Sequence, residues 1–165
     1  MRNKLLIEAV GTFFLCLAAL VSSNALPVAA LLCALIYMGA PVSLAHYNPA
    51  VSLAFRLRGR SSTRALWSYI AVQLAAAVLA AMAAGTLLGH DSEHARGAVD
   101  ALSESAFVGF GVSAGIELLC TFALAFIILM VGTSRLTAGN SYFGLAIAVA
   151  VLGLSGPFGD FNPTM

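Results

Sequence analysis

Long apolar runs separated by short polar segments form the dominant pattern of this chain. An apolar helix of about 17–25 residues is long enough to cross the hydrocarbon core of a bilayer. By this criterion the pattern predicts five membrane-spanning helices, which cover residues 4–23, 26–42, 65–89, 106–131 and 141–157. The first run, with its basic start, also resembles a secretory signal peptide, but its length and the early Glu8 favour a membrane span.

The segment 43–58, between the second and third predicted spans, is too short to cross a membrane. It contains the step Asn48-Pro49, and helices favour Asn at the N-cap and Pro at the first helical position. A second such step, Asn162-Pro163, follows the fifth apolar run. A helix that starts inside a membrane directs free backbone N–H groups and a positive dipole end at whatever lies there. The two steps therefore indicate a pore or a binding site near the membrane midplane.

The composition supports a location in the bilayer and excludes several classes of function. Hydrophobic residues make up 61% of the chain and charged residues 9%, whereas a soluble domain has about 25% charged residues. The net charge is +1 and no basic patch is interleaved with aromatic residues, so we expect no nucleic-acid partner. The sequence shows no nucleophile–base pair, glycine-rich phosphate loop or metal-ligand set, so we expect neither an enzyme nor a cofactor or metal.

Cysteine and histidine residues do not change this interpretation. Cys16, Cys33 and Cys120 each lie in an apolar run, and their odd number indicates buried, inert thiols rather than a disulfide or metal site. His90 and His94 lie in an acidic loop, which we interpret as a solvated loop in preference to a metal site.

The basic residues predict the orientation in the membrane. Seven of the eight flank one side of the proposed spans, whereas Arg96 lies in the acidic segment 90–105. Because cytoplasmic loops carry the excess of Lys and Arg, we expect a cytoplasmic N-terminus and segment 90–105 outside. Segment 43–58 must then enter and leave on the cytoplasmic side, as a re-entrant segment. The seven residues are Arg2, Lys4, Arg56, Arg58, Arg60, Arg64 and Arg135.

The two halves of the chain repeat each other. Glu8, Thr12, Phe13 and Leu15 recur at one constant offset as Glu117, Thr121, Phe122 and Leu124. The spans between the copies place the second copy upside down in the membrane, and inverted repeats are typical of channels and transporters with a midplane site. We therefore expect one membrane domain over 1–165, with a first repeat at about 1–89 and an incomplete second repeat at about 106–165.

The paired Glu-x-x-x-Thr-Phe motifs, the loop from Ser43 to Val51 and the second Asn-Pro step give the chain a resemblance to the aquaporin and glycerol-facilitator family. This family is also called the major intrinsic protein family, and the likeness extends over the whole chain. The resemblance implies an all-α transmembrane fold, an aquaporin-like inverted-repeat helical bundle with a re-entrant half-helix. It also implies a homotetramer in a cell membrane, with one pore in each subunit.

Three departures from the family pattern affect what we expect. The family usually has Gly at the position of Leu44, which bears on how closely the loop can pack. The second motif usually continues with Ala and Arg, where this chain has Thr164 and Met165. The sequence then stops before a second half-helix and a sixth span, so we expect a truncated piece of a longer protein, with five of six spans present.

The resemblance assigns the pore motifs to Asn48, Pro49 and Ala50 in the first loop and to Asn162, Pro163 and Thr164 in the second. It implies that the two Asn side chains meet at the midplane and donate N–H groups to a passing oxygen. The chemistry of an N-cap agrees, because the cap uses the Asn carbonyl oxygen and leaves the NH2 group available. Donors without acceptors orient each water and break a proton-conducting chain, and two positive helix ends repel cations. The alternative is that both Asn residues are plain helix caps.

Three further residues have predicted supporting roles. Carboxylates inside a membrane are costly, and the resemblance implies that Glu8 and Glu117 support the loops by accepting backbone N–H groups. Glu8 can instead extend to the membrane edge near Lys4, and a proton relay is a further alternative. The resemblance places His46 in the cytoplasmic vestibule, where it is either a pH-dependent gate or a neutral, hydrogen-bonded loop residue.

The solute class depends on the narrowest part of the pore. The family's usual spacing from each Asn places Val28, Ala150, Gly159 and Met165 at the constriction. This set is small and apolar, so we expect a passive channel for water and small uncharged solutes such as glycerol, urea, ammonia or metalloid acids. Two alternatives remain open: a non-conducting truncated fragment, and an ion-coupled secondary transporter, which needs paired acids at the midplane.

Overall fold

The computed structural model of the protein describes the backbone of residues 1–88 and 106–158, and the side chains of residues 1–87 and 114–155. The described chain is helical throughout and contains no strand. Its elements are α1 (Arg2–Val21), α2 (Ala25–Ser43), α3 (Pro49–Leu57), α4 (Thr63–Leu88), α6 (Ala106–Thr133), the short 3-10 helix η1 (Arg135–Thr137) and α7 (Phe143–Phe158). The acidic segment 90–105 with its histidines and the second Asn-Pro step lie outside the described residues.

Four of the described helices, α1, α2, α4 and α6, are long and apolar enough to cross a membrane. They correspond to the first four predicted spans, so the chain is an integral membrane protein with the expected all-α bundle. Helix α7 lies where the fifth span was predicted but is shorter, with 16 residues. The number of membrane crossings therefore stays a prediction.

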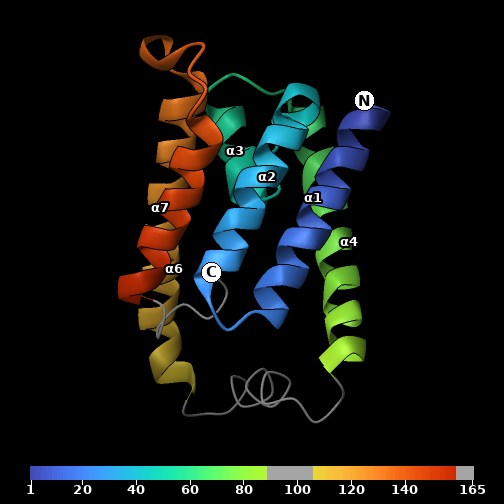
Figure 1. Ribbon diagram of the computed structural model, residues 1–165, viewed down its shortest axis with the longest axis vertical. Coiled ribbons are helices and arrows are strands. Elements are labelled where there is room, and N and C mark those ends of the chain that lie inside the picture. The colour runs from blue at the N-terminus through green and yellow to red at the C-terminus, as the bar shows by residue number, and fades with distance from the viewer. Residues whose placement is uncertain (89–105, 159–165) are drawn as a thin grey trace.

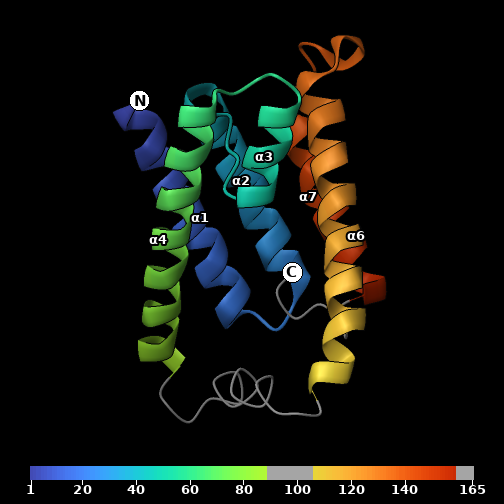
Figure 2. The same cartoon turned by 180° about the vertical axis from the view of Figure 1, so that it is seen from behind.

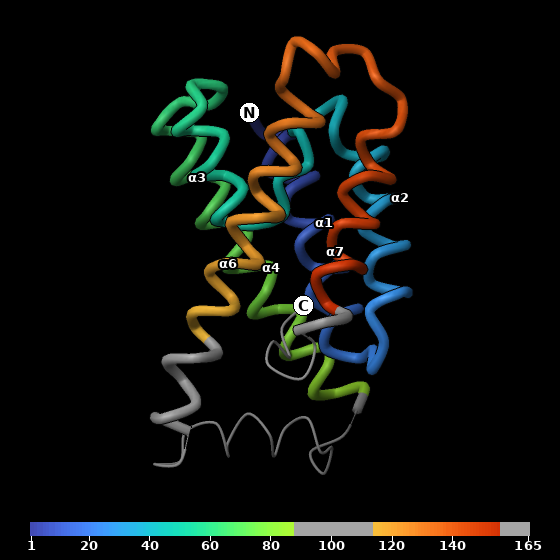
Figure 3. The backbone as a smooth tube through the Cα atoms, turned by 90° about the vertical axis from the view of Figure 1, so that its left-hand side faces the viewer, coloured from blue at the N-terminus to red at the C-terminus, as the bar shows by residue number. Residues whose placement is uncertain are grey.

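The helices form a bundle in which α2 lies between two pairs (Figure 1). Helix α1 packs against α2 and α4 on one side, and α2 packs against α7, which in turn contacts α6. The short helix α3 fills the space between α4 and α6 at one end of the bundle (Figure 2). The tube view shows the same arrangement from the side (Figure 3).

Segment 43–58 has the re-entrant course that the sequence predicts. Helix α2 ends at the same end of the bundle as the N-terminus, the chain turns back toward the middle, and α3 returns to the end it came from (Figure 2). The connections from α3 to α4 and from α6 to α7 lie at this end as well (Figure 1). The predicted basic side of the molecule is thus one end of the bundle, and its orientation in the cell stays a prediction.

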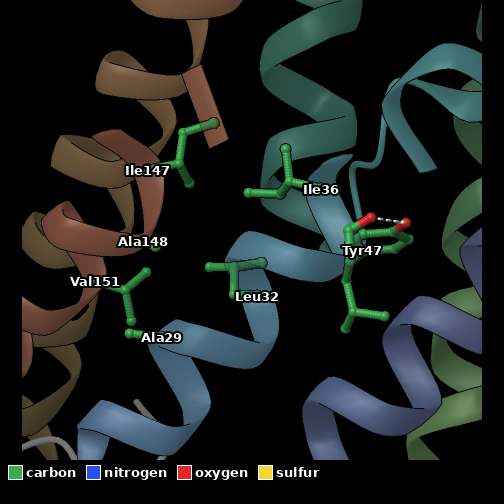
Figure 4. Packing of buried hydrophobic residues seen from close by; sticks show 8 residues of the cluster. Ala29, Leu32, Ile36, Tyr47, Ile147, Ala148 and Val151 are labelled. Carbon is green, nitrogen blue, oxygen red and sulfur yellow. Dashed lines mark hydrogen bonds between the residues drawn. The ribbon is translucent and has the colours of Figure 1, made fainter. Parts of the chain in front are cut away.

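The best-packed apolar region lies between α2 and α7 (Figure 4). Small Ala29 and Ala148 let the two helices approach closely, which is the usual way for helices to associate where lipid removes the hydrophobic drive. The region also includes Leu32, Leu35, Ile36, Tyr47, Ile147 and Val151. This packing fixes the position of α7 against α2, and both helices line the cavity into which the N-terminal end of α3 faces.

Candidate functional site

A cavity of about 440 Å³ lies between α1, α2, α3, α6 and α7. Most of its wall is apolar, with side chains such as Val28, Leu32, Ile128, Ile147 and Val151. Polar side chains in the wall include His46, Asn48, Glu117, Thr121 and Asn140. A mostly apolar cavity with a few convergent polar groups is the usual form of a small-molecule site.

Asn48 lies in the cavity wall at the N-terminus of α3. Its side-chain Oδ1 accepts a hydrogen bond from the backbone N–H of Ala50 at 2.7 Å, and Pro49 occupies the first helical position. The cap thus uses the carbonyl oxygen of the Asn48 side chain, as the sequence predicts. The Asn48 side chain lines the cavity. Its Nδ2 hydrogens, which are hydrogen-bond donors, and the positive end of α3 therefore occur together in the cavity wall.

The connection that leads into α3 has an unusual backbone. Leu44, Ala45 and Tyr47 have φ values of 74°, 50° and 49°, in the left-handed region. For residues with a Cβ this conformation costs about 1–2 kcal/mol each. The family's usual Gly is therefore the unstrained residue at position 44. The exposed Leu44 side chain does not obstruct packing, so the substitution affects the backbone and not the contacts.

Glu8 of α1 holds this connection in place. Its side chain is fully buried. Oε1 accepts hydrogen bonds from Ser43 Oγ at 2.6 Å and from the His46 N–H at 3.0 Å. Oε2 accepts from the Tyr47 N–H at 2.8 Å and from Gln73 Nε2 at 2.9 Å. Four donors satisfy a buried carboxylate, and this geometry does not agree with the alternative of Glu8 at the membrane edge.

His46 is buried between α3 and α4. Its ring lies tilted against Phe55, with 4.2 Å between ring centroids, and edge-on to Tyr69, with 5.1 Å between centroids. Nδ1 lies 3.0 Å from Ser52 Oγ, whereas Nε2 has no hydrogen-bond partner. Burial, together with the nearby Lys4 charge, lowers the pKa of His46 to about 4. The ring is thus neutral at physiological pH, which favours the hydrogen-bonded alternative over a pH gate.

Tyr47 lies directly against two glycines, Gly11 of α1 and Gly39 of α2. A Cβ at Gly11 would overlap ring atoms of Tyr47, and a Cβ at Gly39 would overlap its hydroxyl oxygen. That hydroxyl donates a hydrogen bond to the Leu35 carbonyl oxygen at 2.9 Å (Figure 4). The sequence does not reveal this fit, because the two glycines belong to different helices and Tyr47 to the connection before α3.

The sequence also does not predict most of the network around Glu8. Gln73 Nε2 donates to Ser52 Oγ at 3.1 Å, and Tyr69 Oη donates to the Ser43 carbonyl oxygen at 2.9 Å. A polar residue within an apolar run, such as Gln73, is a signal for such a role. Ser43 and Ser52, the two buried serines of this network, carry no comparable signal, since Ser is common on exposed surfaces.

Glu117 of α6, the counterpart of Glu8 in the second half, lines the cavity and accepts a hydrogen bond from Thr121 Oγ1 at 3.2 Å. Its predicted loop lies outside the described residues, so the predicted meeting of the two Asn-Pro loops stays a prediction. Also outside are Gly159, Asn162, Pro163, Thr164 and Met165.

Of the predicted constriction residues, Val28 and Ala150 are described. Val28 is buried and lines the cavity. Ala150 is half-buried on α7, and the side chains that α7 contributes to the described wall include Ile147 and Val151. The composition of the constriction as a whole stays a prediction.

Comparison with known proteins agrees with these features. The family model described as major intrinsic protein matches residues 6–156. The chain belongs to the major intrinsic protein family. Its similarity to the plant proteins named Aquaporin NIP1-1 is 33% identity over 164 residues for Zea mays and 34% over 165 residues for Arabidopsis thaliana. In both cases 91% of this chain is covered.

Other members of the family are also similar. Nodulin-26 of Glycine max is 30% identical over 168 residues, which covers 91% of this chain and 58% of nodulin-26. Aquaglyceroporin AqpS of Rhizobium meliloti (strain 1021) is 41% identical over 68 residues, covering 41% of this chain and 27% of its own. The two NIP1-1 proteins are covered to 56% and 55% of their lengths, so the chain spans about half the length of the curated relatives it matches.

Proposed function

We propose that the protein is a passive channel for water and small uncharged solutes. The observation that carries this proposal is the position of Asn48, which caps α3 with its carbonyl oxygen and lines a largely apolar cavity of about 440 Å³. The names of the similar proteins, aquaporin and aquaglyceroporin, support the same class of solute.

The mechanism we propose relies on donors and dipoles. The Asn48 amide donates to the oxygen of a passing solute, and the N-terminus of α3 contributes a positive potential that repels cations. In the second half, Asn162-Pro163-Thr164 provides the matching helix start, and Glu117 supports it as Glu8 supports the first loop. A water held by donors on both sides does not pass a proton to its neighbour, so the pore excludes protons and ions.

The apolar wall favours neutral solutes, and Val28 with Ala150, Gly159 and Met165 sets the narrowest point in this proposal. Glycerol, urea, ammonia and undissociated metalloid acids are candidates because each is small and uncharged. We also propose a homotetramer in a cell membrane, with a cytoplasmic N-terminus. An ion-coupled transporter is disfavoured, because the four donors around Glu8 leave that carboxylate committed to structure.

Two substitutions test the role of Asn48. Asn48→Asp keeps an oxygen acceptor for the Ala50 N–H, so α3 stays capped, but it replaces the amide donors with a negative charge. Proteoliposomes should then swell in an osmotic gradient with either protein, whereas the variant should also conduct cations. The matched control is Asn24→Asp, since Asn24 caps α2 through Leu26 N at 2.8 Å and does not line the cavity.

Swelling rates by light scattering and ion flux by a potential-sensitive dye separate the outcomes. A folded protein that gives no flux above empty vesicles contradicts the channel. Flux that needs an ion gradient supports a transporter instead. Equal cation leak in the Asn48 and Asn24 variants contradicts the role of Asn48.

A further inference from the structure

A second cavity, of about 580 Å³, opens at the end of the bundle that carries the N-terminus. Three cationic side chains line it: Lys4 of α1, Arg60 of the α3–α4 connection and Arg64 of α4. The described lining includes no Asp or Glu. The nearby carboxylate of Glu8 is fully buried and accepts four hydrogen bonds. The cavity therefore combines positive charge with no neutralising partner among its described walls.

The start of α4 adds to this positive charge. Ser62 caps the helix by accepting a hydrogen bond from the Ala65 N–H at 3.1 Å, and Ser61 and Ser62 both line the cavity. The N–H groups of the first turn and the positive end of a 26-residue helix are thus at the cavity. Arg60 donates one bond to the Thr133 carbonyl oxygen at 3.2 Å, which orients the guanidinium and leaves other N–H groups.

His46 provides an independent observation. Its side chain is 5% exposed, lines this cavity, and has no hydrogen-bond partner at Nε2. Gln73 Nε2 donates to Ser52 Oγ, and the Ser52 hydroxyl has two acceptors in reach: His46 Nδ1 at 3.0 Å and Gln73 Oε1 at 3.5 Å, of which His46 is the nearer. A neutral imidazole that accepts at Nδ1 carries its proton at Nε2. In that tautomer the unpartnered Nε2 is a buried N–H donor, on a side chain that lines the cavity.

We propose that this cavity binds a phosphate group, held by Lys4, Arg60 and Arg64 beside the buried ring of His46. Guanidinium groups bind phosphate oxygens in pairs, and a helix N-terminus is a common phosphate site. The group comes either from the headgroup of an anionic phospholipid or from a free phosphate ester. Because Leu44 and His46 line both cavities, a phosphate bound in the second cavity lies next to the first cavity. The proposal does not depend on what the first cavity conducts.

Binding to the purified full chain in nanodiscs tests the proposal and separates the two sources. In the first arm, nanodiscs of phosphatidylcholine are titrated with glycerol 3-phosphate and followed by ³¹P NMR. In the second arm, nanodiscs contain phosphatidylglycerol, and native mass spectrometry counts the lipids retained. Saturable binding in either arm supports the site and identifies its source. No saturable binding in both arms overturns the proposal.

Charge-matched variants locate the binding. Arg60→Gln with Arg64→Gln removes two lining cations, whereas Arg58→Gln with Arg135→Gln removes two that do not line the cavity. The first pair should weaken binding by about tenfold or more, and the second by less than about twofold. Equal weakening in both pairs indicates diffuse surface charge and overturns the site. If the first pair does not give a folded, monodisperse protein, Lys4→Gln provides the test, with loss of binding expected and unchanged binding contradicting the proposal.

Discussion

Glu8 connects three helices through its two carboxylate oxygens. Its donors come from the end of α2, from the connection that precedes α3 and from α4. The family resemblance implies that Glu8 supports the loop, and the burial of its carboxylate among four donors favours this role over a place at the membrane edge. The partners Ser43 and Gln73 could not be paired with it in advance, since hydrogen bonds between distant residues leave no local pattern.

Replacing Glu8 by Gln should destabilise the protein. The amide keeps the shape but brings its own N–H donors to four existing donors, so at least one buried donor loses its acceptor. We expect the free energy of unfolding, measured by reversible unfolding in detergent micelles, to fall by about 2–3 kcal/mol. The matched control is Thr12→Val, one turn along α1, because Thr12 Oγ1 is buried without a partner. A change for Glu8→Gln no larger than that for the control contradicts the support role.

Leu44→Gly should stabilise the protein. Leu44 has a φ of 74° and an exposed side chain, so Gly relieves backbone strain and loses little packing. The free energy of unfolding should rise by about 1 kcal/mol, which is the relieved strain less the entropy cost of adding a glycine to the unfolded chain. Leu53→Gly is the control, since Leu53 is similarly exposed on regular α3 and the change there should cost about 1 kcal/mol. The same unfolding assay compares both, and a loss at position 44 contradicts the strain argument.

Among the elements, α3 shows both what a sequence pattern predicts and what it cannot. Its start at Asn48-Pro49 agrees with the sequence, because capping is a local property. The depth to which the connection enters the bundle depends on Tyr47 fitting against α1 and α2. A glycine in an apolar run does not reveal which side chain needs its space.

Double substitutions test this fit. Gly39→Ala should cost about 1–3 kcal/mol, because its Cβ overlaps the Tyr47 hydroxyl. Tyr47→Phe removes that oxygen, so it should recover part of the loss for Gly39→Ala but not for Gly11→Ala, where ring atoms overlap. Gly85→Ala is the control, since nothing lies within 4 Å of its Cβ position. Additive effects in the Gly39–Tyr47 cycle, measured by unfolding, contradict the contact.

At the scale of the whole molecule, the apolar runs predicted four helices of membrane length, and these form the bundle. The basic residues predicted that the N-terminus and segment 43–58 share one end, which the fold agrees with (Figure 1). The second Asn-Pro step lies outside the described residues, so the closure of a pore by two loops stays a prediction. Helix α7 is too short to settle the number of crossings by length.

Membrane topology can be tested with introduced cysteines. In a background without the three native cysteines, Ser62→Cys and Ser134→Cys should react with an impermeant thiol reagent only from the cytoplasmic side. Ser92→Cys in segment 90–105 should react only from outside, because the excess of Lys and Arg lies on the other side. Labelling of Ser62→Cys and Ser92→Cys from the same side contradicts the predicted orientation.

The place of Gln73 has a consequence for synthesis. The chain emerges from the ribosome in order, so α3 and its strained connection are complete before α4 exists. Only when Gln73 arrives does the Glu8 carboxylate gain its fourth donor, and α4 is also the first of the two helices, α4 and α6, that α3 packs against. We therefore expect the half-helix to remain open to protease in nascent chains that stop before α4 and to become protected once α4 has been inserted.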